Sequence, residues 1–285
     1  MEGIVGGRKK KVWSVFKIAL LAVLLAGYMI PFILVLINAF KRSGTIIRNP
    51  LRVMDPNGIT LDNFKKAYES MDFPRAFFNS LLITVVSVAI IILISSMTAY
   101  LFVRASWKIN GIFFALMVAA MIIPFQVLMI PIVSIYGGAL GLLDHKATLI
   151  FFNVGFGISM ATFIYHGFIK GNVPISLEEA AMLDGCTRRQ TFFKIVFPIL
   201  KPVTATIIVL DVLWVWNDYL LPSLVLTSKN NFTLPLSTYS FYGTYSVDYG
   251  ALMAALVLTV IPVIILYLFL QRQIISGVIS GAVKS

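Results

Sequence analysis

Charged residues are scarce in this sequence of 285 residues. Asp, Glu, Lys and Arg together make up 12% of the chain, whereas hydrophobic residues make up 59%. An ordinary soluble domain has about 25% charged residues, so the composition excludes a typical water-soluble fold. Several apolar runs exceed the roughly 20 residues that a helix needs to cross a hydrocarbon core of about 30 Å. The sequence therefore predicts an all-α membrane protein that crosses the bilayer several times.

Cysteine and histidine are also rare. The single Cys186 excludes an internal disulfide. His145 and His166 are not part of a group of Cys, His and carboxylates at ligand spacing, so we expect no metal site. The sequence also has no G-x-x-x-x-G-K-[ST] phosphate-binding loop. We therefore expect no cofactor in this chain, and no nucleotide bound through that motif.

Six apolar runs are long enough to cross the membrane. The basic start "GGRKKK" resembles a signal peptide, but the apolar run from Val15 to Phe40 is too long for one, so it should remain as a membrane helix. The segment Lys41–Phe77, with the turn signal "DPNG", is expected to form a short extracytoplasmic cap. The predicted spans are 14–40, 78–103, 109–135, 148–169, 203–226 and 249–270.

The net charge of +11 is best explained by membrane orientation. With both termini in the cytoplasm, 14 of the 23 Lys and Arg residues fall on the inner side, which favours this orientation. We therefore expect a cytoplasmic segment 1–13, a six-helix transmembrane domain 14–270 and a cytoplasmic tail 271–285.

The most polar helix-forming stretch lies in the predicted cytoplasmic loop 170–201. Ser176 and Glu179 have the spacing of a capping box, and Gly185 can adopt the left-handed conformation that ends a helix. Thr187 and Gln190 predict a second helix that ends near Pro198. A short acidic helix suits docking to another protein. The alternative, a helix lying on the membrane surface, usually carries Lys and Arg on its polar face.

This loop resembles the EAA loop of ATP-binding-cassette importer permeases. Their pattern is EAA-x3-G-x9-I-x-L-P, and Phe197 in place of Leu is the only departure. "VWNDYLLP" at 215–222, "NSLLIT" at 79–84 and "GAVK" at 281–284 resemble the carbohydrate-uptake branch, and in particular the six-span subunit of maltose and multiple-sugar systems.

The resemblance implies a type I importer permease fold and a coupling helix that docks into a cytoplasmic ATPase. It implies a heterodimer with a second permease, two ATPase subunits that bind ATP and Mg, and an extracytoplasmic solute-binding protein, all at a bacterial inner membrane. This chain would then not be an enzyme. The residues that it assigns to ATPase coupling are Glu178, Glu179, Ala180, Ala181, Asp184, Gly185, Ile195 and Pro198.

Ionisable residues within spans are candidates for the substrate pathway. Asp211 is about 12 Å into the fifth span, and Asn217 and Asp218 are about 21 Å in. Polar groups beside Trp214 and Tyr219 suit a sugar, which both forms hydrogen bonds and stacks. Helix packing for the aromatics, and a pair with another subunit for Asp211, are alternatives.

The outer segment Thr227–Tyr249 is rich in Tyr, Ser and Thr. Its resemblance to the family implies contact with the solute-binding protein, with Tyr242, Gly243 and Tyr245 at the tip. A rigid interfacial aromatic pair is an alternative reading of the two tyrosines.

Two other functions remain open. A polyol or glycerol-phosphate importer would use the same permease architecture. A secondary transporter driven by ions would have several buried carboxylates and internal repeats, whereas Asp211 is the only acidic residue near the middle of a predicted span.

Overall fold

A computed structural model describes residues 7–56, 58–241 and 247–282. Helices dominate these residues. They form two compact units, Met1–Met71 with Thr238–Val260, and Asp72–Ser237 with Ile261–Ser285. The helices are α1 Gly7–Ala39, α2 Ser43–Arg48, α3 Asp62–Ser70, α4 Phe73–Arg104, α5 Lys108–Ala120, α6 Phe125–Pro131, η1 Ile132–Ala139, α7 Lys146–Asn172, α8 Ile175–Leu183, α9 Arg188–Thr191, η2 Phe192–Val196, α10 Phe197–Ile199, α11 Lys201–Asn217, α12 Leu220–Val225, η3 Lys229–Asn231, α13 Leu234–Ser237, η4 Thr238–Phe241 and α14 Tyr249–Ala282.

The centre of the second unit is the packing of α4 against α7. At the start of both helices, Lys146 Nζ donates to Asn79 Oδ1 over 2.6 Å. Midway, a Cβ on Gly157 would lie 2.6 Å from Cδ1 of Ile91, so glycine permits the close approach. At the far end, Arg104 donates to the carbonyl of Val173, which follows α7. The two helices are therefore parallel and in contact along their length.

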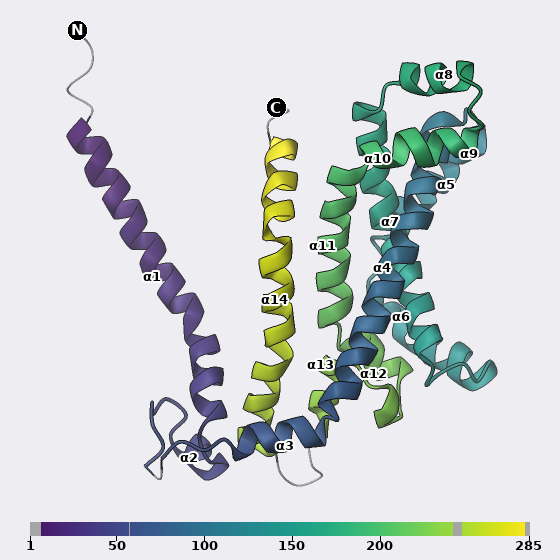
Figure 1. Cartoon of the computed structure of the whole chain (residues 1–285). Helices are drawn as coiled ribbons and strands as arrows, with labels where there is room; N and C mark the ends of the chain where they lie inside the picture. The colour runs from purple at the N-terminus through teal and green to yellow at the C-terminus, as the bar shows by residue number, and fades with distance from the viewer. Residues whose placement is uncertain (1–6, 57, 242–246, 283–285) are drawn as a thin grey trace. The chain divides into compact units, whose positions relative to one another are not determined.

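Helix α11 packs against this pair in the opposite direction. Its first half joins the apolar cluster near the end of α7, where the hydroxyls of Thr204 and Tyr165 are 2.8 Å apart. Its last residues lie near the start of α4, where the rings of Trp216 and Phe77 are 5.8 Å apart. Figure 1 shows α8 and α9 together at one end of α4, and α12 at the other end.

The membrane spans agree in part with the six predicted runs. Among the described residues, four helices are long and apolar enough to cross a membrane, and the number rises to six if each of two bent helix pairs is one span. The predicted span 109–135 is bent by 92° between α5 and α6. Pro124, which has no N–H, stands at this bend as the N-cap residue of α6. The second bent pair joins Arg188–Ile199 to Lys201–Asn217 at 74°. The predicted span 203–226 therefore covers two helices, since α11 ends at Asn217 and α12 begins at Leu220.

The first unit contains a compact polar cap after α1. The buried amide of Asn63 donates to the carbonyls of Ala39 and Lys41. Ser43 Oγ donates to Asp248 Oδ1 over 2.8 Å and so joins α2 to the start of α14. The expected turn at "DPNG" is present, since the Gly58 N–H donates to the Asp55 carbonyl. Gly58 has a φ of 83°, in the left-handed region.

Candidate functional site: the loop between α7 and α11

Helix α8 does not begin with the predicted capping box. Its N-cap is Pro174, which makes no side-chain capping bond, and Ser176 and Glu179 lie inside the helix. The fixed φ of proline favours a helix start at this point. The predicted capping interaction between Ser176 and Glu179 is therefore wrong.

The predicted end of α8 is confirmed. Gly185 has a φ of 85°, in the left-handed region. Its N–H donates to the Met182 carbonyl, and the N–H of Cys186 donates to the Ala181 carbonyl. These two bonds form a Schellman motif, which satisfies carbonyls that the last turn would otherwise leave free.

The second predicted capping box is also confirmed. Thr187 accepts from the backbone of Gln190, and the Gln190 side chain accepts from the Thr187 N–H. The helix then widens into a π-turn, η2, before Pro198 and the break at Leu200. The loop is thus two short helices with defined ends.

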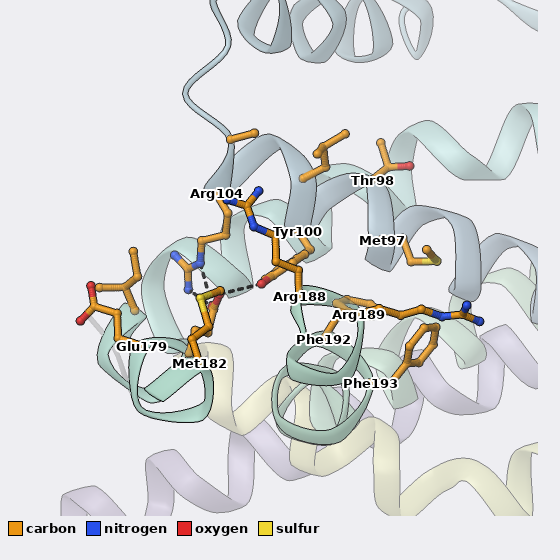
Figure 2. Close-up of a pocket in the computed structure, with 14 residues that line it drawn as sticks. Met97, Thr98, Tyr100, Arg104, Glu179, Met182, Arg188, Arg189, Phe192 and Phe193 are labelled. Carbon is orange, nitrogen blue, oxygen red and sulfur yellow. Dashed lines mark hydrogen bonds and ion pairs between the residues drawn. The ribbon is translucent and has the colours of Figure 1, made fainter. Parts of the chain in front are cut away.

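Glu178 joins α8 to the end of α4. The Nε and Nη2 atoms of Arg104 lie 2.8 and 2.7 Å from Oε1 of Glu178, and the Tyr100 hydroxyl donates to Oε2 over 2.7 Å. Glu178 is only 3% exposed. In Figure 2, dashed lines mark the bonds by which Arg104 and Tyr100 hold this carboxylate. The charge is therefore neutralised by the chain's own membrane helix.

Helix α8 turns one side to the chain, one to a groove and one outward, because residues three or four apart share a side of a helix. Glu178 and Ala181 are buried against the chain. Ile175, Glu179 and Met182 line a groove, and Ser176, Ala180 and the 89%-exposed Leu183 lie on the remaining outer face. Asp184 and Pro198 are exposed and Ile195 is half-buried. Of the alanines of the EAA sequence, only Ala180 is therefore available to a partner.

The groove lies between α4, α8 and α9 and has a volume of about 730 Å³. We call it the α4–α8–α9 groove. Figure 2 shows Met97, Tyr100 and Arg104 from α4 on one side, and the helix that carries Arg188 and Arg189 on the other. Its lining residues are Met97, Thr98, Tyr100, Leu101, Arg104, Ala105, Ile175, Glu178, Glu179, Met182, Arg188, Arg189, Phe192 and Phe193.

The five residues that the sequence assigns to the substrate pathway differ in their burial. Asp211 is buried, and its Oδ2 has no hydrogen-bond partner among the described residues. Trp214, Asn217 and Tyr219 are exposed. Asp218 Oδ1 accepts from the N–H groups of Leu220 and Leu221 and so caps α12. Only Asp211 faces the interior of the helix bundle.

The predicted binding-protein contacts Tyr242, Gly243 and Tyr245 lie outside the described residues. The loop before them is held by Asp144, a residue that the sequence did not single out. Asp144 accepts from the backbone of Thr227 and Ser228, from the Ser228 hydroxyl and from the Asn231 amide. Burial raises the pKa of Asp144, but these hydrogen bonds outweigh burial and bring the pKa below its ordinary value.

Sequence reasoning also missed Arg104 and Tyr100. Each is an unremarkable residue at the end of an apolar run, and no local pattern pairs it with Glu178. Arg104 is 74 residues from Glu178 in the chain.

A family model described as "Binding-protein-dependent transport system inner membrane component" matches residues 91–280, which include the whole α8–α9 loop. The chain belongs to this family. It is thus an inner membrane component of a transport system that works with a binding protein.

Similar proteins agree with this assignment. The probable starch degradation products transport system permease protein AmyC of Thermoanaerobacterium thermosulfurigenes is 42% identical over 89% of this chain and 91% of its own length. The multiple sugar-binding transport system permease protein MsmG of Streptococcus mutans is 36% identical over 97% of this chain and 99% of its own length.

A solved structure has the same fold. A chain of a bacterial ABC transporter involved in the import of the acidic polysaccharide alginate superposes with a TM-score of 0.78, covering 95% of this chain and 99% of that chain at 19% identity. The chain therefore has an ABC transporter permease fold.

Proposed function

We propose that this family member is the permease subunit of an ATP-driven importer of a sugar or oligosaccharide. The names of its relatives support the substrate class. The observation that carries the mechanism is the α8–α9 loop, in which a short helix exposes an outer face with Ser176, Ala180 and Leu183 and is fixed by Glu178 to a membrane helix.

The loop can transmit force because its attachment is rigid. Two nitrogens of Arg104 and the Tyr100 hydroxyl hold one buried carboxylate of α8. Charge-assisted bonds of this kind fix geometry as well as energy. When an ATPase subunit moves α8 through its outer face, the end of α4 must follow. The partner ATPases bind ATP and Mg, and this chain performs no covalent chemistry.

The placement of the loop fits a cytoplasmic position. Helix α4 has 32 residues, which corresponds to about 48 Å at about 1.5 Å per residue. The α8–α9 loop lies near its end and the Asp144 loop near its start. The two loops therefore belong on opposite sides of the bilayer. With the excess of basic residues inside, both termini are cytoplasmic and the transmembrane domain covers 14–270, with α5, α6 and η1 as one bent span and α11 as another, while α9 stays in the cytoplasmic loop.

Asp211 is the strongest pathway candidate in this chain. A buried carboxylate oxygen without a partner is costly. A substrate hydroxyl or a polar group of the sister permease would satisfy it during transport. We expect Asp211→Leu to lower uptake while leaving assembly of the complex intact. Asp211→Asn, which keeps the shape and one acceptor, should lower uptake less.

Reconstituted vesicles test the proposal. This chain, its sister permease, the ATPase and the binding protein should together import labelled oligosaccharide only with ATP. Cysteine introduced at Thr187 should react with impermeant reagent only from the ATPase side, whereas cysteine at Asn230 should react only from the other side. Reaction of Thr187→Cys from the binding-protein side would contradict the coupling role.

Uptake driven by a proton gradient without the ATPase would support a secondary transporter. ATP-driven import of a polyol but no sugar would correct the substrate class.

A further inference from the structure

The α4–α8–α9 groove has an apolar lining and a cationic edge. Six large apolar side chains contribute to its walls, and three arginines outnumber two glutamates among its lining residues. The apolar residues are Met97, Leu101, Ile175, Met182, Phe192 and Phe193. Such a surface suits a ligand that combines an anionic group with hydrocarbon.

Two of the arginines are free to bind an anion. Arg104 is already paired with Glu178 and bonded to the Val173 carbonyl. Arg188 and Arg189 are exposed, and within the described part of the chain neither side chain has a hydrogen bond or ion pair. Figure 2 shows the side chain of Arg188 beside Arg104 and Tyr100, and that of Arg189 extending past Phe193.

The groove lies where a membrane helix meets the bilayer surface. The apolar helix α4 ends at Arg104, and the exposed Trp107 follows three residues later. Tryptophan favours the level of the lipid headgroups. Leu101, Met97 and Leu93 are exposed and lie four residues apart on one side of α4, leading from the groove toward the middle of the helix.

We propose that this groove binds one anionic phospholipid. Arg188 and Arg189 hold its phosphate and headgroup, and an acyl chain lies along Leu101, Met97 and Leu93. The site goes beyond the coupling function, because the face of α8 with Ser176, Ala180 and Leu183 is absent from the groove and stays available to the ATPase. Of the residues assigned to coupling, only Glu178 and Glu179 also line the groove. Basic pockets beside membrane helices bind anionic headgroups in this way.

A crosslinking experiment on the full complex tests this site. The probe is phosphatidylglycerol with a photoreactive acyl chain, added to complex reconstituted in phosphatidylcholine nanodiscs, with peptide mapping of the products. Crosslinks should map to residues 93–101 and 192–193. In Arg188→Gln/Arg189→Gln, half-saturation should need about thirtyfold more probe, from the loss of two surface cations. Glu179→Gln removes a repulsive charge at the groove, so it should lower that concentration.

The matched control is Lys194→Gln/Lys201→Gln, which removes two exposed charges from the same loop at positions that do not line the groove. It should behave as the unmodified complex does. The proposal fails if both double variants respond alike, or if photoreactive phosphatidylcholine labels the groove equally well. It also fails if labelling appears only after the ATPase is removed, because the ATPase would then fill the groove. Competition by soluble glycerol phosphate at the same concentration as unlabelled phosphatidylglycerol would show that the acyl chain plays no part, and would likewise overturn it.

Discussion

Removing Arg104 tests whether α8 is fixed to α4 by a buried ion pair. Glu178 is 3% exposed, so Arg104→Ala would leave a buried carboxylate with Tyr100 as its remaining partner. Removing one member of a buried pair costs about 3 to 5 kcal/mol. The lower value applies, because the Arg104 side chain is 20% exposed and water can replace it in part. A cost of about 3 kcal/mol makes local opening of α8 about a hundredfold more frequent.

Hydrogen–deuterium exchange of residues 175–183 in the assembled complex measures this opening. Tyr100→Phe removes one hydrogen bond to a charged group, which is worth about 1.5 kcal/mol, and should accelerate exchange about tenfold. Arg104→Ala/Glu178→Gln should exchange more slowly than Arg104→Ala alone, since no buried charge remains. Substrate-stimulated ATP hydrolysis should fall in the same order as protection.

Lys170→Ala is the matched control, because Lys170 is an exposed cation in the last turn of α7. It should leave the exchange of α8 unchanged. Equal exchange in Arg104→Ala and Lys170→Ala would refute the attachment. Strict additivity of the Arg104 and Glu178 substitutions would refute the pairing.

Three further predictions concern single sites. Gly185→Ala forces a side chain into a left-handed conformation at a cost of about 1 to 2 kcal/mol and should lower substrate-stimulated ATPase activity. The control Gly171→Ala, within helix α7, should leave this activity unchanged. Equal activities of the two variants would remove Gly185 from the coupling mechanism. The pKa of Asp144 is lowered in the folded state, so its carboxylate contributes stability at pH values above its ordinary pKa of about 4. This stability is lost as the pH falls through the folded-state pKa. Asp144→Asn should therefore flatten the acid side of the profile of melting temperature against pH, and an unchanged profile would contradict this. A Cβ on Gly250 would lie 2.6 Å from Asn63 Oδ1, so Gly250→Ala should cost about 1 to 3 kcal/mol and lower the melting temperature; an unchanged value would show that the polar cap adapts.

The sequence alone determined the features that depend on neighbouring residues. Long apolar runs placed the membrane helices, because only a helix satisfies its own backbone in lipid. The left-handed Gly185 and the Thr187–Gln190 capping box were predicted because both are local bonds spanning three to five residues. The expected box at Ser176 failed for an equally local reason, since Pro174 starts the helix earlier.

The tertiary structure decided which side of each helix is buried within the chain and which side is exposed. An apolar run has no polar face from which a direction can be read, so the sequence could not tell that Asp211 is buried while Trp214 and Asn217 are exposed. It also could not show that Glu178 is held by Arg104, because the two are 74 residues apart and only the parallel packing of α4 and α7 brings them together. Charge and spacing define which groups can pair, whereas the fold decides which of them meet.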